Sequence, residues 1–270
     1  MKKVALALGG GGAKFFAHLG MIEVLQENNI PIDYISGSSM GSIAGCLIAN
    51  GVEIQDIKKV FYKKRYFLNW LTPSFRRFGF LSQKGISKRL EKLLPQRNIE
   101  KSKIGLSITS SNILDGNLHL FEKGDIITAV NASCAFPGVF PPVQFEGKML
   151  VDGGVLNNIP ADICRKKVGK NGIVISSTVD AKMHCKLEDI KSPFDIYQRI
   201  IYLPMYEKRA EVMNKNSDFV IEHFKEKTLS IKTGQDVFKV VNKKALEAFY
   251  ELGRTATLRH IDEIKKLINS

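Results

Sequence analysis

Ser39 lies at the centre of a Gly-x-Ser-x-Gly pattern, Gly37-Ser38-Ser39-Met40-Gly41. The apolar stretch 32–35 predicts a strand before it, and residues 40–50 predict a helix after it. A serine on such a sharp strand-to-helix turn is exposed at the end of a sheet, above a helix N-terminus that favours developing negative charge. The pattern indicates a serine nucleophile for acyl transfer. A serine that merely caps the helix would give the same pattern.

A run of four glycines, Gly9 to Gly12, follows the continuous apolar stretch 4–8 and precedes a predicted helix over 13–28. Such a stretch is typical of a strand buried on both faces of a parallel sheet. A glycine-rich turn between a strand and a helix exposes backbone N–H groups that bind an anion. The N–H groups of Gly11 and Gly12 could therefore form an oxyanion hole for an ester carbonyl. A tight turn without a ligand also fits.

Dinucleotide binding is a second functional interpretation of the glycine run. Gly10 and Gly12 begin a Gly-x-Gly-x-x-Gly fingerprint, and Asp33 follows about 20 residues later, where an acidic residue would bind a ribose. Phe15, however, stands where the fingerprint needs its last glycine. This interpretation predicts a nicotinamide-dependent oxidoreductase and rests on these few residues alone.

A serine hydroxyl needs a base before it attacks a carbonyl carbon. Asp152 precedes Gly153 and Gly154 at the end of a predicted strand, an arrangement that brings a carboxylate close to a neighbouring backbone. A carboxylate alone can serve as the base when it is poorly solvated and within hydrogen-bond reach. An aspartate that only binds its own backbone in a turn fits the same position.

Histidine is the alternative base, and the chain has five. His184 follows a predicted strand and fits a Ser-Asp-His order. His18 is predicted on the first helix near the glycine run and His119 in a hairpin. His223 and His260 are predicted in amphipathic C-terminal helices. No motif surrounds any of the five.

A sheet is needed to bring these side chains together. Two strand–helix units in the first 50 residues predict a parallel sheet with helices on its faces. The glycine run and Ser39 would then lie at the carboxyl ends of neighbouring strands, where active sites of open α/β sheets form. Asn158 is predicted to cap a helix with Pro160 in its first turn. Further predicted elements are a hairpin over 103–111 and 117–121, a helix over 125–135, a rigid loop over 136–142, a hairpin over 143–145 and 148–151, a strand over 172–179, and helices over 192–270.

Length and composition limit the possible classes of protein. The 270 residues are 44% apolar and 25% charged, which is ordinary for a globular protein, and their number suits one α/β domain or two small domains. Because the sequence has no internal repeat and no linker, a single domain is expected, with motifs over about 4–180 and a helical part over about 192–270. No apolar run approaches the roughly 18 residues of a membrane-spanning helix. The first apolar stretch is shorter than that of a signal peptide, so a cytoplasmic protein is expected. Because the four cysteines lack metal-ligand spacing, Cys46, Cys134 and Cys164 are expected to be reduced core residues, without zinc.

The net charge of +13 is concentrated in residues 58–90, which carry ten basic side chains and no acidic one. Many aromatic and aliphatic side chains lie between these charges, which suits an interfacial element on an anionic membrane. Stacking on single-stranded nucleic acid uses the same mixture. A pair of amphipathic helices with aromatic side chains in the core and lysines in water is the competing structural interpretation. We expect a peripheral membrane contact through 58–90 and no nucleic-acid partner.

Five stretches occur in a specific order within about residues 4–180. They are Gly10-Gly11-Gly12-Ala13-Lys14, Ala17-His18-Leu19-Gly20, Gly37-Ser38-Ser39-Met40-Gly41-Ser42, Ala132-Ser133-Cys134-Ala135-Phe136-Pro137-Gly138-Val139-Phe140-Pro141-Pro142 and Val151-Asp152-Gly153-Gly154-Val155-Leu156-Asn157-Asn158-Ile159-Pro160. Together they resemble the motifs of bacterial patatin-like phospholipases, which are acyl-ester hydrolases. The resemblance implies a three-layer α/β/α sandwich with a mainly parallel central sheet.

The resemblance also implies a catalytic dyad, with Ser39 as the nucleophile and Asp152 as the base. The implied oxyanion hole comprises Gly10, Gly11, Gly12 and Ala13, and the supporting motif residues are Lys14, Gly37, Gly41, Gly153 and Gly154. No metal and no cofactor is implied. The expected function is hydrolysis of phospholipids or related lipid esters, in which water activated by Asp152 releases the fatty acid.

The chain departs from the family pattern at two positions. Lys14 replaces the commoner arginine, and Phe15 stands where glycine is usual. A phenylalanine adopts left-handed backbone angles only at a cost of ~1 kcal/mol or more, so the glycine loop is expected to be shifted or the substrate preference changed. Phe15 and the cationic segment 58–90 leave an alternative function open, a non-catalytic lipid- or acyl-binding protein on the same fold.

Overall fold

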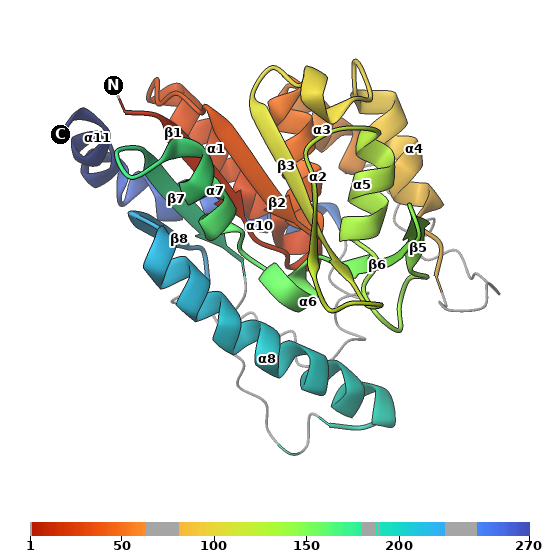
Figure 1. Cartoon of the computed structure of the whole chain (residues 1–270). Coiled ribbons are helices and arrows are strands. Elements are labelled where there is room, and N and C mark those ends of the chain that lie inside the picture. Colours follow the sequence, from red (N-terminus) through yellow and green to blue (C-terminus); the bar gives the residue numbers. More distant parts are fainter. Residues whose placement is uncertain (1, 63–80, 180–186, 188–189, 225–241) are drawn as a thin grey trace.

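A central sheet organises the computed structural model, which describes residues 2–62, 81–179, 187, 190–224 and 242–270 (Figure 1). Eight described strands follow the order β5-β6-β3-β2-β1-β7-β8, and β4 also pairs with β3. Strands β3, β2, β1, β7 and β8 are parallel, whereas β4 and β6 pair antiparallel with β3, and β5 with β6. The bounds are β1 Val4–Leu8, β2 Tyr34–Ser38, β3 Gly105–Asn112, β4 Leu118–Phe121, β5 Val143–Phe145, β6 Lys148–Asp152, β7 Ile173–Thr178 and β8 Phe219–Glu222. The expected mainly parallel sheet is confirmed.

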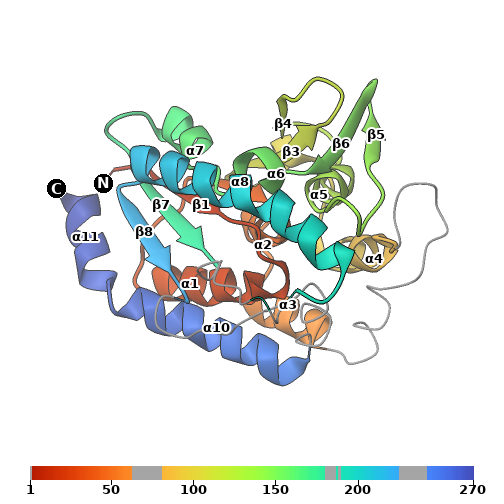
Figure 2. The ribbon, with the colours of Figure 1, turned by 90° about the horizontal axis from the view of Figure 1, so that it is seen from below.

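Helices cover both faces of this sheet (Figures 1 and 2). One face carries α1 (Phe16–Glu27), α2 (Met40–Ala49), α5 (Ile126–Ser133) and α10 (Lys243–Leu258), and α3 (Ile54–Phe61), α4 (Lys84–Leu93) and α11 (Ile261–Asn269) add side chains to the same core. The other face carries α6 (Gly154–Asn157), α7 (Ala161–Val168) and α8 (Pro193–Asn216). Two short 3-10 helices are η1 (Gly12–Phe15) and η4 (Ile99–Lys101). The predicted three-layer α/β/α architecture is therefore confirmed.

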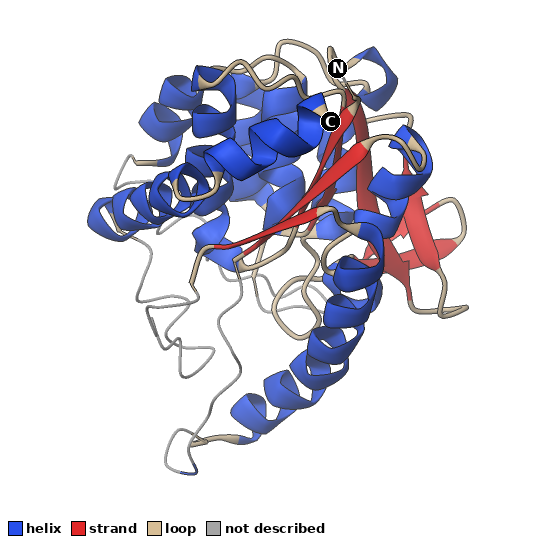
Figure 3. Cartoon of the chain, turned by 90° about the vertical axis from the view of Figure 1, so that its left-hand side faces the viewer, coloured by secondary structure: helices blue, strands red, loops and turns tan. Residues whose placement is uncertain are grey.

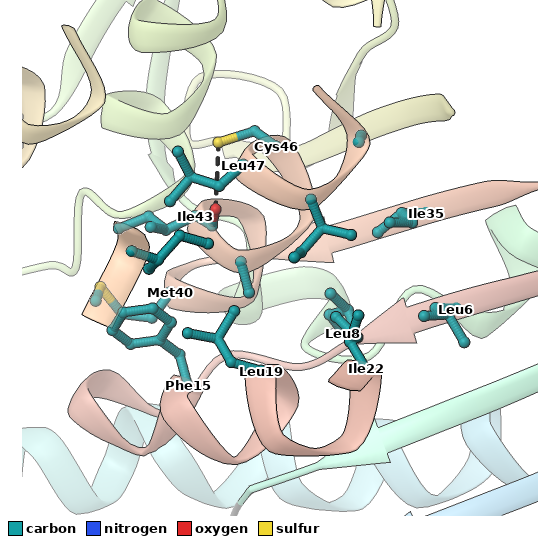
Figure 4. Close-up of a cluster of buried hydrophobic side chains, with 14 of the residues drawn as sticks. Leu6, Leu8, Phe15, Leu19, Ile22, Ile35, Met40, Ile43, Cys46 and Leu47 are labelled. Atoms are coloured by element: carbon teal, nitrogen blue, oxygen red, sulfur yellow. Dashed lines mark hydrogen bonds between the residues drawn. The ribbon is translucent and has the colours of Figure 1, made fainter. Parts of the chain in front are cut away.

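Strand β1 shows why both faces are covered. All five of its residues are fully buried. Leu6 and Leu8 join the larger core, which includes Leu19 of α1 (Figure 4). Ala7 joins a smaller core with Cys164 of α7 on the opposite face. Because successive side chains of a strand point to opposite faces, a wholly apolar strand needs a helical layer on each.

Strand β2 begins two residues later than predicted and continues into the glycine–serine pattern. The prediction placed it at 32–35, whereas the observed strand is Tyr34–Ser38. Its parallel register with β1 extends to Gly37 opposite Leu8, and Ser38 still pairs with Thr109 of β3. Pairing with β1 and β3 therefore keeps Gly37 and Ser38 in the strand, although small residues of this kind have little strand propensity of their own.

Asp33 lies at the amino end of the sheet. Its Oδ2 accepts a hydrogen bond from the N–H of Val4 at 2.7 Å, and its own N–H donates to the Val4 carbonyl at 2.8 Å. The glycine run begins at the other end of the same strand, after Leu8. A dinucleotide site needs the acidic residue and the glycine loop at the same end of the sheet. The dinucleotide interpretation is therefore wrong.

The described residues of the C-terminal part are mostly helical, as predicted, but they also include a strand. Helix α8 begins after Ser192, whose Oγ accepts from the N–H of Asp195. Strand β8, within the region predicted as helix, pairs parallel with β7. His223 follows this strand, and His260 lies between α10 and α11, so neither is inside a helix. An edge strand of four residues is too short to show a period in the sequence.

The two ends of the basic segment 58–90 are helical and contact the core. In α3, Ile57 and Phe61 are buried, and Lys58 Nζ lies 3.1 Å from Oε1 of Glu247. In α4, Arg89 is buried. These ends fit the interpretation as core-facing amphipathic helices. Residues 63–80 lie outside the described residues, so membrane contact through 58–90 stays a prediction. Within the described part, no helix is long and apolar enough to cross a bilayer.

Three of the four cysteines are free and buried, as predicted: Cys46, Cys134 and Cys164. Burial, followed by the nearby carboxylate of Asp152, raises the pKa of Cys134 well above its usual value. Such a thiol is a poor nucleophile. Cys185 lies outside the described residues. Among the residues that the structure describes, no group of three or more His, Cys, Asp or Glu side chains could hold a metal ion.

Candidate active site

The predicted site residues gather at one end of the sheet. Residues 10–14 follow β1, residues 37–41 connect β2 to α2, and residues 152–154 end β6 and begin α6. Because β1 and β2 are adjacent parallel strands, their carboxyl ends lie side by side. Strand β6 enters the same region by pairing antiparallel with β3. The sequence therefore identified three segments that the fold brings together.

Ser39 lies on the sharp turn between β2 and α2. The strand ends at Ser38 and the helix begins at Met40, so one residue makes the connection. Its φ of 50° and ψ of −129° are unfavourable for a residue with a side chain, and such angles cost about 1–3 kcal/mol. Its side chain makes no capping hydrogen bond to α2. The interpretation of Ser39 as a helix cap is therefore wrong.

Close contacts in this turn explain why positions 10 and 41, on either side of Ser39, are glycine. A Cβ on Gly41 would lie 2.6 Å from the carbonyl oxygen of Gly9 and closer still to that of Leu8. A Cβ on Gly10 would lie 2.8 Å from the Cβ of Ser39. Cβ atoms essentially never approach other atoms this closely. The two glycines allow the glycine run and the start of α2 to lie against each other, with Ser39 between them.

Ser39 and Asp152 form a direct hydrogen bond. The Oγ of Ser39 donates to Oδ2 of Asp152 at 2.6 Å. Asp152 is 2% exposed, whereas Ser39 is half-buried and so is the more accessible of the two. A short hydrogen bond between a hydroxyl and a carboxylate has the geometry of a nucleophile beside its base.

The backbone around Asp152 fixes the orientation of its carboxylate. Oδ1 accepts from the N–H of Gly154 at 2.8 Å, and the N–H of Asp152 donates to the Ala135 carbonyl at 3.0 Å. Ser111 Oγ donates to the Asp152 carbonyl at 2.9 Å. The carboxylate therefore binds its own turn through one oxygen and Ser39 through the other. The turn contact that the sequence suggested for Asp152 is therefore present, but it is not the only contact of this carboxylate, and its role as a base stays a prediction.

Ser133, at the end of α5, connects the two halves of this site. Its Oγ accepts a hydrogen bond from the N–H of Ser39 at 2.8 Å, and its carbonyl accepts from the N–H of Gly153 at 3.2 Å. One residue thus holds the backbone of the serine turn and the backbone that follows Asp152. The sequence analysis included Ser133 only as part of a motif and assigned it no role.

The glycine run is anchored by Asn158. The N–H of Gly10 donates to Oδ1 of Asn158 at 3.1 Å and to its carbonyl at 3.3 Å. Asn158 was predicted to cap a helix, but α7 begins after Pro160 and receives no side-chain cap. That prediction is wrong because the Asn158 side chain binds a loop 148 residues away. No hydrogen bond within the described part uses the N–H of Gly11, and Gly12 adopts a left-handed φ of 62°.

A buried chain of polar side chains lies behind the glycine run. Nε2 of His18 lies 2.8 Å from the carbonyl oxygen of Gly9, and its Nδ1 lies 2.7 Å from Oγ of Ser177. Nε2 of His223 lies 2.7 Å from the same Oγ. Because a carbonyl only accepts, Nε2 of His18 carries the proton. Burial, followed by the nearby His18, lowers the pKa of His223 well below its usual value, so that ring is neutral near pH 7.

His18, His119 and His223 contact residues other than Ser39 and Asp152. His18 and His223 bind Ser177. His119 packs its ring edge-on against Phe121, with 4.4 Å between centroids. His184, the histidine that fitted a triad order best, lies outside the described residues. Among the described side chains, the hydrogen-bond acceptor of the Ser39 hydroxyl is therefore the carboxylate of Asp152.

Phe15 does not strain the glycine loop. Its φ of −56° and ψ of −18° are right-handed helical values, and its ring is fully buried 5.3 Å from the ring of Phe61. The left-handed angle lies at Gly12 instead. Phe15 therefore avoids the costly left-handed angles, while the expected shift of the loop or change of substrate preference stays a prediction. Lys14 is nearly buried, and its Nζ lies 5.4 Å from the centroid of the Phe224 ring, a cation–π distance.

Comparison with known sequences places these motifs in a family. The profile described as patatin-like phospholipase matches residues 6–165, more than half of the chain, including Ser39 and Asp152. The chain belongs to the patatin-like phospholipase family. The patatin-like match ends before α8, β8, α10 and α11, so the C-terminal helices are outside it.

Relatives of the patatin-like chain include much longer proteins. An uncharacterised NTE family protein of Mycobacterium tuberculosis is 36% identical over 160 residues, which cover 58% of this chain and 44% of that protein. Lysophospholipase NTE1 of Candida albicans is 31% identical over 198 residues, which cover 71% of this chain and 14% of that protein. The chain thus spans less than half the length of these relatives. The crystal structure of VipD from Legionella pneumophila has a TM-score of 0.45 and 16% identity, covering 94% of this chain and 67% of that chain.

Proposed function

We propose that this chain is a serine hydrolase of phospholipids or related lipid esters. The 2.6 Å hydrogen bond between Ser39 Oγ and Asp152 Oδ2, on a strained turn at the carboxyl ends of the parallel strands, carries this proposal. Membership of the patatin-like phospholipase family supports the substrate class. The name of the lysophospholipase relatives is consistent with a lipid ester.

In the first step, Asp152 Oδ2 takes the proton of the Ser39 hydroxyl while Oγ attacks the ester carbonyl carbon. The carbonyl π electrons move to the oxygen and give a tetrahedral oxyanion. When the C–O bond to the alcohol breaks, the proton on Asp152 passes to the leaving alkoxide. The products of this step are the alcohol and an acyl group on Ser39. The bond from Gly154 N–H to Oδ1 keeps Oδ2 directed at Ser39 throughout.

The oxyanion would be stabilised by backbone donors of the glycine loop. The N–H of Gly10 already donates to Asn158. We therefore leave Gly10 out and propose the N–H groups of Gly11, Gly12 and Ala13 as the donors of the oxyanion hole. The positive end of α2, directly after Ser39, adds a favourable field. Removing one such donor from an enzyme typically lowers kcat by about 10²–10³.

In the second step, water replaces the alcohol. Asp152 accepts a proton from a water molecule, and the resulting hydroxide oxygen attacks the acyl carbon. The tetrahedral species collapses, the C–O bond to Ser39 breaks, and the proton on Asp152 returns to Oγ. The fatty acid leaves and the dyad is restored.

A substrate panel with matched variants tests this function. Phospholipids, lysophospholipids and short p-nitrophenyl esters would be incubated with wild type, Ser39→Ala and Ser38→Ala. Ser38 is the neighbouring serine, and its buried Oγ has no hydrogen-bond partner within the described part. We expect Ser39→Ala to lose turnover and fluorophosphonate labelling, and Ser38→Ala to keep both.

Two results would contradict the proposal. Equal labelling of wild type and Ser39→Ala would show that Ser39 is not the nucleophile. Vesicle binding by a folded wild type that releases no fatty acid from any substrate would favour the alternative, a non-catalytic lipid-binding protein.

A further inference from the structure

The outward face of helix α8 changes character halfway along its length. Four large apolar side chains are exposed on its first half, Ile196 (50%), Tyr197 (41%), Ile200 (62%) and Leu203 (54%). Ile196 and Ile200 are four residues apart, and Tyr197, Ile200 and Leu203 are each three apart, so the four side chains share one face of the helix. The exposed residues that continue this face in the second half are polar or charged: Glu207, Lys208, Glu211, Asn214 and Lys215.

Exposed apolar side chains are concentrated around this half-helix. The described part of the chain exposes nine large apolar side chains, and six of them lie between residues 187 and 203. Besides the four on α8, these are Leu187, 88% exposed, and Ile190, 38% exposed. Isolated exposed apolar side chains are normal on a protein surface, whereas a contiguous set marks an interaction site. We call this set the α8 apolar face.

The α8 apolar face adjoins the candidate active site. Its helix packs beside the dyad through Met205, whose methyl group lies next to Gly154. Tyr202 stacks on Phe136, with 5.4 Å between ring centroids, and Tyr197 lies against Gly138. α8 crosses near the carboxyl ends of the strands, and its N-terminal half extends beyond them (Figures 1 and 3).

The charged residues near the α8 apolar face favour one kind of binding partner over another. On α8 and directly before it, Lys191 is exposed and Arg199 is half-buried, whereas Asp195 is buried and accepts hydrogen bonds from Ser192 and Lys191. The acidic residues Glu188 and Asp189, between Leu187 and Ile190 in the sequence, lie outside the described residues. The whole chain carries +13. Cations flanking an apolar helical face suit an anionic lipid surface. A second copy of this chain would instead bring together two molecules of the same high positive charge.

We propose that the α8 apolar face inserts into the surface of an anionic lipid bilayer and holds the active site over it. The apolar stretch from residue 193 to 204 is roughly 17 Å long at 1.5 Å per residue. That length suits a helix lying in the interface, where such apolar faces enter by ~5–10 Å. The inference takes its lipid substrate from the proposed function, but attachment itself needs no turnover.

Vesicle partition tests this attachment. The probe is sonicated vesicles of phosphatidylglycerol and phosphatidylcholine, and the protein carries Ser39→Ala so that the lipid stays intact. Partition is measured at 0.5 M salt, which screens ionic attraction to about 4 Å and so reduces any contribution from residues 58–90. The test variant is Ile200→Gln with Leu203→Gln. The matched control is Leu258→Gln on α10, which is 49% exposed.

We expect the double variant to lower the partition coefficient by about tenfold or more, because two buried leucine-sized side chains are lost from the lipid. Leu258→Gln should stay within about twofold of its parent. When Ser39 is kept as serine, the Ile200→Gln, Leu203→Gln double variant should hydrolyse a soluble short-chain ester at the wild-type rate. This result would also show that the double variant is folded. Equal partition of the two variants would overturn the proposal.

Two further results separate the possible failures. A dimer in sedimentation that the double variant converts to a monomer, with unchanged vesicle partition, would assign the face to a second copy of the chain and overturn the lipid assignment. Vesicle binding through α8 by a wild type that hydrolyses no ester would contradict the proposed function and support the attachment.

Discussion

Oδ2 of Asp152 lies 2.6 Å from Oγ of Ser39, although 113 residues separate the two in sequence. The other carboxylate oxygen, Oδ1, is held by the N–H of Gly154 at 2.8 Å. One carboxylate oxygen thus faces the nucleophile while the other fixes the orientation of the group. A substitution can therefore remove the charge of Asp152 while the side chain keeps its position.

Asp152→Asn should remove catalysis and leave the fold intact. The amide oxygen can still accept the N–H of Gly154, so the side chain keeps its place, but the amide cannot take the proton of Ser39. We expect kcat to fall by about 10²–10⁴, the usual contribution of a general base, with a small change in KM. Steady-state hydrolysis of a short p-nitrophenyl ester measures both constants, and thermal unfolding measures the fold.

His184→Ala is the matched test of a triad, since His184 fitted a Ser-Asp-His order in the sequence. We expect its kcat to equal that of wild type within about twofold. A variant that loses activity here while Asp152→Asn retains it would replace the dyad with a histidine-dependent mechanism.

Ser133→Ala should slow the reaction because Ser133 positions the nucleophile. Its hydroxyl accepts the N–H of Ser39 at 2.8 Å, so its loss frees the serine turn to shift. We expect kcat to fall about tenfold to a hundredfold, as for small displacements of a reacting group, and the rate of fluorophosphonate labelling to fall with it.

Ser107→Ala controls for loss of a buried hydroxyl. Ser107 Oγ is fully buried and lies 2.8 Å from Ser36 Oγ, within the sheet. Both variants should lose about 1 kcal/mol of unfolding free energy, but kcat should fall in Ser133→Ala alone. Equal kcat in the two variants would show that Ser133 is merely structural.

Gly41→Ala should destabilise the protein strongly. The new methyl group would meet the backbone carbonyls of Leu8 and Gly9, which cannot move without breaking β1 from its neighbours. Gly45→Ala, one turn later in α2, meets only a side-chain methyl group, Cγ2 of Ile35, at 3.0 Å and no backbone atom. We expect a loss of about 2 kcal/mol or more in urea unfolding for Gly41→Ala, as for other overpacked sites, and less than half of that for Gly45→Ala. Similar losses would contradict the close approach of the two backbones.

The sequence was sufficient to predict where Ser39 and Asp152 lie, at the ends of two strands, because local signals surround both. A strand, two glycines and a helix flank Ser39, and two glycines follow Asp152 at a strand end. The layers were also predictable, since β1 is apolar at every position and so needs cover on both faces. Signals of this kind are contained within about ten residues and do not depend on distant partners.

Features that depend on distant partners could not be predicted. Asn158 looks like a helix cap until the fold places Gly10 beside it. Residues 219–222 form strand β8 because they pair with β7 at the edge of the sheet. In each instance tertiary contacts outweigh a weak local propensity.

His223 should make the stability of the protein depend on pH below neutrality. Burial lowers its folded-state pKa well below the usual value, with His18 as a second cause. In the unfolded chain the ring titrates near 6.5. Between these two pKa values the unfolded state binds a proton that the folded state does not, so stability rises with pH and is lost as pH falls below about 6.5. The slope approaches about 1.4 kcal/mol per pH unit for one such group.

Replacing His223 with glutamine should flatten this slope. The glutamine amide can still form a hydrogen bond with Ser177 Oγ, which lies 2.7 Å from Nε2 of His223, but it takes no proton. The unfolding free energy from urea titrations at pH 7, 6 and 5 should fall less steeply in His223→Gln than in wild type. His119→Gln is the comparison, since partial burial, followed by Lys148, also lowers the pKa of His119. His119 is only half-buried, so its replacement should change the slope less, and an equal or larger change would show that His223 is not the group responsible.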